Sequence, residues 1–305
     1  MSAIHLNGVG LANYCHGSPL PKSSPFNISD SNPDAFYILV LLLGGVKIEI
    51  KGNEVCQIKN FLVIGAPLSH PVVSKNLSAA FSDLHVDFRG KKIFLPAQRT
   101  ILKYLLSQRS NHSLFRPLLN ELLRSFFNNL SGRGLSSFVH LYRTFENMSF
   151  SFPLFYCRYQ TEFLKTYHLL KDFFKGGELD FCSNFYKHLI KLEGVKGTSI
   201  NIKYTCENHE QYIDILVGEA NLILDKRTNT MAITKINAQE CSIDIEHCFD
   251  LIISLRNKYF HHLSGSNSSL SSSQIIDPDE FFHPLNLVGY QVFGFIFTML
   301  IKAHI

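Results

Sequence analysis

The sequence predicts an α+β protein that is mostly helical, with a small β-containing N-terminal domain followed by a C-terminal helical bundle. Early in the chain, apolar and polar residues alternate as they do in strands, for example in VKIEI at 46–50. From Pro96 onward, apolar residues recur at the spacing of helices. The 305 residues are 46% hydrophobic and 18% charged, so the chain can bury a large core.

The N-terminal part divides into an irregular leader over 1–34 and a β-containing domain over 35–132. The leader is rich in Ser, Pro, Asn and Gly and has no periodicity. KGNE between two extended runs predicts a hairpin. The expected strands are FYILVLLL at 36–43, VKIEI at 46–50, VCQIKNFLVIG at 55–65, HPVVS at 70–74 and VDFRGKKIFL at 86–95.

The remaining chain is expected to be mainly helical, and residues 135–305 form the second domain. Ser136 or Ser137 is a candidate cap, and Pro284 could delay the start of the last helix. Short strands are expected at 198–205 and 230–236, and a linker at 265–274. Helices are expected at 97–108, 113–130, 135–152, 159–174, 179–192, 211–224 and 242–263, and from Asp277 to the end.

The cysteine content and the first residues favour a cytoplasmic protein, and the charge bears on its partners. The net charge of +4 permits an RNA partner, although the sequence has no run of basic residues typical of a nucleic-acid-binding arm. The seven cysteines form no CxxC pair, which is typical of reduced thiols. The first residues lack the pattern of a secretory signal. The apolar stretches 36–45 and 285–301 are interpreted as core elements, so no membrane is expected.

The sequence lacks the motifs of several common kinds of metal, nucleotide and catalytic site. The fourteen histidines include no HExxH or other spacing typical of metal ligands, so we expect no metal. Neither GxGxxG nor a GK[ST] phosphate loop occurs, and the nucleophile pattern GxSxG is missing. We therefore expect no cofactor.

The stretch LRNKYFHH at 255–262 carries the strongest chemical signal. On a helix, Cys248, Leu251, Ile252, Leu255 and Tyr259 form an apolar stripe. A separate polar stripe contains Asp250, Ser254, Asn257 and His261. Arg256 lies a quarter-turn from Asn257 and can reach the same groove, whereas His262 leans toward the apolar side.

These residue types suit the cleavage of RNA without a metal. The guanidinium of Arg256 can hold a phosphate, and the imidazole of His261 can move a proton to or from a ribose oxygen. The amide of Asn257 can hold the imidazole or the substrate. Because RNA supplies its own 2′-hydroxyl nucleophile, the expected products are a 2′,3′-cyclic phosphate and a 5′-hydroxyl.

The pattern RNxxxH in an amphipathic helix, followed by a linker and a long terminal helix, resembles the HEPN superfamily over residues 135–305. This resemblance implies a HEPN-like helical domain, a homodimer that brings two motifs together, and endoribonuclease activity of a toxin or antiviral effector. It carries over to Arg256, Asn257 and His261 only. It also implies RNA as the substrate and an antitoxin or defence-system protein as a possible partner.

Arg143 and His262 are candidate substrate-binding residues. His140, Arg143 and Glu146 recur at three-residue steps, so they could form a wall of an RNA cleft, or a solvated face with an Arg–Glu pair. His283 could line the cleft, although a structural role is the simpler reading. The rival hypothesis for the whole protein is a non-catalytic interaction or sensor module, in which residues 1–130 could bind a small molecule.

Overall fold

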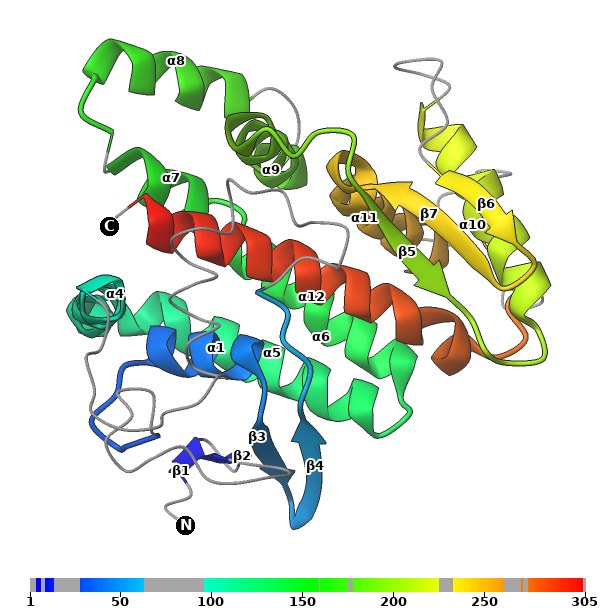
Figure 1. Ribbon diagram of the computed structural model, residues 1–305, viewed down its shortest axis with the longest axis horizontal. Coiled ribbons are helices and arrows are strands. Elements are labelled where there is room, and N and C mark those ends of the chain that lie inside the picture. Colours follow the sequence, from blue (N-terminus) through cyan, green and yellow to red (C-terminus); the bar gives the residue numbers. More distant parts are fainter. Residues whose placement is uncertain are drawn as a thin grey trace.

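The computed structural model describes residues 4–6, 9–13, 28–62, 96–158, 160–174, 178–224, 233–260, 270 and 274–303. In this part of the chain, helices dominate and two small antiparallel sheets lie at opposite sides of them (Figure 1). The predicted α+β, mostly helical fold class is confirmed. The candidate strands at 70–74 and 86–95 lie outside the described residues.

The first sheet has the strand order β1-β2-β3-β4. Its members are β1 (Ile4–Leu6), β2 (Val9–Asn13), β3 (Val46–Ile50) and β4 (Asn53–Gln57). The β3–β4 hairpin is confirmed, and its turn places Gly52 at φ 81°. The prediction of an irregular leader was wrong for β1 and β2. β2 pairs with β3 and buries Val9 and Leu11. These two apolar residues stand beside glycines, so the sequence around them does not show the pattern of a strand.

The apolar run at 36–43 is a helix and not a strand, so this prediction was wrong. Every residue of α1 (Asp34–Leu43) is buried, and a helix buried on all sides has no apolar period that could distinguish it from a buried strand. Pro33 precedes the helix and Gly44 ends it. A Cβ on Gly44 would lie 2.7 Å from the carbonyl oxygen of Lys59, and its φ is +82°, so this position requires glycine.

The expected helices from residue 96 onward are present with shifted ends. The helix predicted over 135–152 breaks after Met148, and a further helix follows. The described helices are α4 (Pro96–Ser107), the 3-10 turn η2 (Gln108–Asn111), α5 (His112–Leu130), α6 (Gly134–Met148), α7 (Ser151–Arg158), α8 (Phe163–Phe173), α9 (Glu178–Glu193), α10 (His209–Leu224), the 3-10 turn η3 (Ile245–His247), α11 (Cys248–Phe260) and α12 (Pro278–Lys302).

The second sheet has the order β5-β7-β6, and α10 packs against it. Its strands are β5 (Ser199–Lys203), β6 (Ile233–Asn237) and β7 (Glu240–Asp244). The helix predicted from residue 242 therefore begins only at Cys248. Cys241 and Ile243 alternate into the core, so the residues before the helix form the central strand of this sheet.

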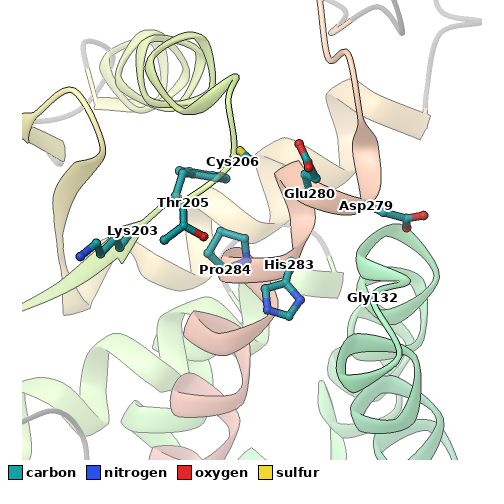
Figure 2. Close-up of a pocket in the computed structure, with 9 residues that line it drawn as sticks. Gly132, Lys203, Thr205, Cys206, Asp279, Glu280, His283 and Pro284 are labelled. Atoms are coloured by element: carbon teal, nitrogen blue, oxygen red, sulfur yellow. The ribbon is translucent and has the colours of Figure 1, made fainter.

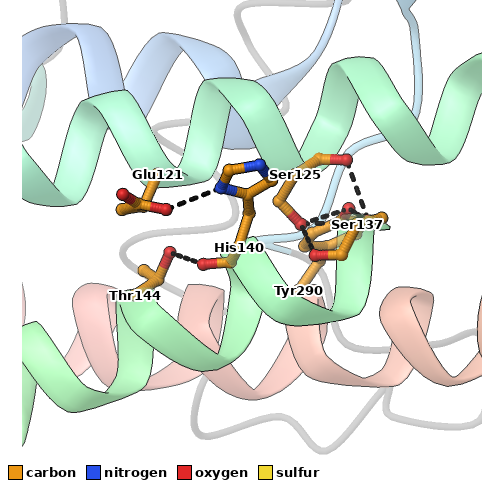
Figure 3. A network of polar contacts seen from close by, with 6 residues as sticks. All are labelled: Glu121, Ser125, Ser137, His140, Thr144 and Tyr290. Carbon is orange, nitrogen blue, oxygen red and sulfur yellow. Dashed lines mark hydrogen bonds and ion pairs between the residues drawn. The ribbon is translucent and has the colours of Figure 1, made fainter. Parts of the chain in front are cut away.

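α12 passes through the middle of the molecule beside α6, and α5 packs on α6 (Figure 1). Three buried hydroxyls join these helices: Tyr290 Oη lies 2.8 Å from the Oγ atoms of both Ser125 and Ser137 (Figure 3). The ring of Tyr290 stacks on Phe126 at 4.1 Å. Ser137 is thus a core residue. Since Arg133 is the N-cap of α6, both Ser136 and Ser137 lie inside the helix, and the prediction that one of them caps it was wrong.

The start of α12 is fixed by Asp277. Its carboxylate accepts hydrogen bonds from the backbone nitrogens of Asp279 at 2.8 Å and Glu280 at 3.3 Å. Pro284 lies inside the helix and does not delay its start. By length and composition α12 could cross a membrane, but 89% of its most apolar window is buried inside the protein, as in the core helix of a soluble protein.

The domain boundary predicted at 132–135 falls in the turn between α5 and α6. These two helices pack against each other, and the buried apolar residues form one cluster from β2 to α12. The two predicted parts of the chain therefore share a core in the described structure. Their division into separate domains stays a prediction.

Candidate functional site

α11 presents the motif on a helix that is anchored along its other side. Cys248, Leu251, Ile252 and Leu255 are each at most 2% exposed, as the predicted apolar stripe requires. Tyr259 packs edge-on against Phe282 of α12 at 5.1 Å between ring centroids. These contacts fix the rotation of α11, so Arg256 and Asn257 are directed toward its accessible side.

Arg256 lies against α6. Its guanidinium carbon is 4.6 Å from the ring centroid of Tyr142, and its Nη2 is 3.8 Å from Oε1 of Glu146. Tyr142 and Glu146 are one turn apart on α6, so they form one short strip beneath the guanidinium. The side chain of Arg256 is 26% exposed. The aromatic face and the carboxylate hold this cation at the surface of the α6–α11 seam.

Asn257 contacts Arg256 directly. Its Oδ1 accepts a hydrogen bond from Nη1 of Arg256 at 3.1 Å, and the residue is exposed. The sequence suggested that Asn257 holds the imidazole or the substrate. In the structure its described contact orients the guanidinium instead.

His261 and His262 lie outside the described residues, which end in this region at Phe260. The structure therefore brings Arg256 and Asn257 together and leaves the predicted proton-transfer residue unplaced. In the sequence, His261 follows directly after Phe260, the last described residue of α11.

The predicted polar stripe on α11 is divided among neighbouring helices. Asp250 accepts hydrogen bonds from Ser183 at 2.6 Å and from Lys187 at 2.5 Å, both on α9. Lys258, which is not a member of the predicted stripe, forms an ion pair with Glu219 of α10. Asp250 thus ties α11 to α9, and the accessible part of the stripe begins closer to Asn257.

The candidate wall on α6 faces two different helices. Nδ1 of His140 lies 2.7 Å from Oε2 of Glu121 on α5 (Figure 3). Burial alone would raise the pKa of Glu121, but the hydrogen bond from His140, with the charges of Arg143 and Arg124, outweighs it and lowers that pKa. Arg143 is exposed and acts on the α5 side, whereas Glu146 contacts α11.

A cavity of about 360 Å³ lies where the α5–α6 turn, the end of β5 and the first turns of α12 meet (Figure 2). Asp279, Glu280 and His283 of α12 line it opposite Lys203 and Cys206. Partial burial lowers the pKa of His283, and burial next to Glu280 raises the pKa of the Cys206 thiol. The two carboxylates make this cavity a poor site for a phosphate backbone.

Sequence analysis did not single out a group of possible metal-ligating residues around η3. Ligand atoms of Asp244, Glu246 and His247 lie within 4.8 Å of one another, a spacing that a metal ion could bridge. Lys196 and His247 already approach the Glu246 carboxylate at 3.5 Å. The spacing DxEH is the only signal of this group in the sequence, and it is common on surfaces.

Comparison of the chain with known protein families, with curated proteins and with solved structures gave no match.

Proposed function

We propose that the protein is a metal-independent endoribonuclease of the HEPN type, acting in the cytoplasm as a homodimer and as a toxin or antiviral effector. One observation carries the proposal: the Arg256–Asn257 pair is held at the accessible edge of α11, and in the sequence His261 follows Asn257 by four residues. The resemblance of RNxxxH to the HEPN motif supplies the reaction.

Arg256 would bind the phosphate to be cleaved. Its contact with Glu146 is long, at 3.8 Å, and both side chains are partly exposed, so this ion pair is weak and a phosphate can replace the carboxylate. Tyr142 would keep the guanidinium plane in place during that exchange. Asn257 would restrict the guanidinium further by its hydrogen bond.

His261 would transfer protons. The 2′-oxygen loses a proton to an imidazole and attacks phosphorus, the bond from phosphorus to the 5′-oxygen breaks, and the leaving 5′-oxygen takes a proton. Two imidazoles are needed to act as base and acid in one step, and a homodimer would supply one from each protomer. Arg143 is exposed on the α5 side of α6, so it would bind only RNA backbone that extends across α6 beyond the α6–α11 seam.

Cleavage of RNA in the presence of a chelator tests the proposal. Wild type should produce 2′,3′-cyclic phosphate and 5′-hydroxyl ends. Arg256→Ala and His261→Ala should each lower the rate at least about a hundredfold, the scale of a lost acid–base group. Arg133→Ala and His168→Ala remove exposed residues of the same types from other surfaces and should leave the rate unchanged. If RNA stays equally intact with wild type and with His261→Ala in every condition, the proposal that the protein is an endoribonuclease is wrong.

The same experiment in cells identifies the substrate class. RNA ends should be mapped after expression of wild type and of His261→Ala, with growth measured in parallel. Cuts that appear only with wild type support a toxin or defence nuclease. Sedimentation of the purified protein should show a dimer at the concentrations at which it cleaves.

A second candidate is a non-catalytic interaction module of a defence or toxin system. The contacts of Arg256 with Tyr142 and Glu146 favour it, because they are those of a residue that joins two helices. In this case, Arg256→Ala together with His261→Ala would leave growth inhibition or partner binding intact. If the double variant loses RNA cleavage and still binds its partner, the motif acts in catalysis and not in partner binding.

A further inference from the structure

A second cavity, remote in sequence from the motif, lies where the N-terminal ends of α1 and α5 meet. Its volume is about 240 Å³, and its lining includes Ser31, Asp34, Arg109, His112 and Arg116. Three of these five side chains can carry positive charge, and only one is acidic. The volume is below the range of about 300–1,000 Å³ typical of ligand pockets, so the cavity suits a small ligand.

Asp34 holds two of the three basic groups in place. Its carboxylate lies 2.9 Å from Nε of Arg116 and 2.6 Å from Nδ1 of His112. The Asp34 side chain is only 2% exposed, and both of its oxygens and Nε of Arg116 are closed off from solvent. Asp34 is one of the lining residues, but its two oxygens are closed off from solvent, so its carboxylate pairs with the arginine and the histidine and is not open to a ligand.

Both arginines retain donors that no described residue occupies. Arg116 contacts Asp34 through Nε, so its two Nη groups remain for a ligand, and its side chain is 28% exposed. Arg109 donates from Nη2 to the carbonyl oxygen of Ser31 at 2.8 Å and keeps its other nitrogens. His112 uses Nδ1 toward Asp34, and its Nε2, on a side chain that is 62% exposed, is a donor only when the ring is protonated. The described structure thus presents two arginines with spare donors and one histidine around one small cavity.

We propose that this cavity binds a phosphate group. Guanidinium groups bind phosphate through parallel hydrogen bonds, and the positive ends of two helix dipoles add to the attraction. Asp30 is acidic and, together with the larger effect of burial, raises the pKa of the Tyr37 hydroxyl, but it does not line the cavity. The phosphate is either free or carried by a small organic phosphomonoester, and the site is independent of the RNA-cleaving motif.

Titration calorimetry of the full chain with three probes tests the ligand class. Inorganic phosphate and ribose 5-phosphate should bind saturably at constant ionic strength, and ribose should not. Tighter binding of ribose 5-phosphate would assign the site to an organic phosphomonoester, and equal affinities would assign it to free phosphate. Failure of both phosphates to bind, or equal binding of ribose, would overturn the proposal.

Substitutions assign any binding to this cavity. Arg109→Gln and Arg116→Lys should each weaken phosphate binding by about tenfold, because each loses charged donors. Arg116→Lys keeps a cation beside Asp34, and Arg109 is exposed, so both variants should fold; far-UV circular dichroism checks this. Arg124→Gln, two turns further along α5, is the matched control and should bind as wild type does. Folded variants with unchanged affinity would place the phosphate elsewhere and overturn the site.

Discussion

Arg256 is held by neighbours that differ strongly in how much they stabilise the fold. The ion pair with Glu146 joins two partly exposed groups at 3.8 Å, so solvent screens it. Tyr142 is only 5% exposed and forms part of the buried surface beneath the guanidinium. The aromatic residue, and not the carboxylate, should therefore determine the stability of this seam.

We expect Glu146→Ala to change the free energy of unfolding by less than about 1 kcal/mol, as for exposed ion pairs. Tyr142→Ala should lower it by about 3–5 kcal/mol, the cost of removing a buried aromatic ring. Urea denaturation of both variants measures the difference. A Glu146→Ala variant as unstable as Tyr142→Ala would show that the ion pair is much stronger than its exposure indicates.

At this scale, sequence reasoning could place Arg256 and Asn257 on the accessible side of their helix, because the apolar stripe of α11 fixes its rotation. It could not identify Glu146 as the partner of Arg256, or Glu121 as the partner of His140. Both pairs join helices whose relative positions depend on packing. Periodicity along one helix contains no information about the side chains that face it from another.

The helices of the central layer approach closely at glycines. A Cβ on Gly134, at the start of α6, would lie 2.0 Å from the carbonyl oxygen of Asp279 in α12. Since that atom belongs to the backbone, it cannot move aside as a flexible side chain would. The junction of α6 and α12 thus depends on a residue without a side chain, a requirement that the sequence SGRG does not distinguish from an ordinary helix stop.

We expect Gly134→Ala to lower the free energy of unfolding by at least about 1–3 kcal/mol, the usual cost of overpacking. Gly218→Ala is the matched control. Gly218 also lies in a helix, and a Cβ there would meet no atom within 4 Å, so alanine should stabilise the protein by about 0.5–1 kcal/mol. Thermal unfolding of both variants should shift in opposite directions; a neutral Gly134→Ala would mean that α6 and α12 can separate without loss.

Elements with an apolar period or clear end signals were predicted well, and elements without either were not. The helices α5 and α9 have apolar stripes, so their extents agree with the sequence to within a few residues. α12 is buried on all sides from Val292 to Ile301 and has no stripe there, but its length and the start signal at Asp277 and Pro278 predict it. α1 and β7 are buried by partners from other parts of the chain, and their own residues do not define their conformation. The wrong predictions for α1 and β7 have the same physical cause, because in both elements contacts with distant parts of the chain determine which residues are buried.

Across the whole molecule, part of the acid sensitivity should arise at a half-buried histidine. His188 of α9 lies between the rings of Phe173, at 5.4 Å, and Tyr156, at 5.9 Å. Burial lowers its pKa from 6.5, and the charges of Lys191 and Lys165 lower it further. The unfolded chain therefore binds a proton more readily than the folded protein, and the stability present above pH 6.5 is lost as pH falls below that value.

We expect His188→Gln to reduce this loss. Urea denaturation at about pH 7.5 and about pH 5 should show a smaller drop in the free energy of unfolding for His188→Gln than for wild type. His168→Gln, on the exposed surface of α8, should behave as wild type does. The same drop in all three proteins would remove His188 as its source.

The complete burial of α1 has a consequence for the turnover of the protein. All of its residues, from Asp34 to Leu43, are buried, and α5 and α4 pack against it. Any partial separation of these helices would expose one uninterrupted apolar segment to the solvent, the type of segment on which aggregation starts and to which chaperones bind. The lifetime of the protein in a cell should then depend on how often the region around α1 unfolds locally, more than on the free energy of unfolding of the whole protein.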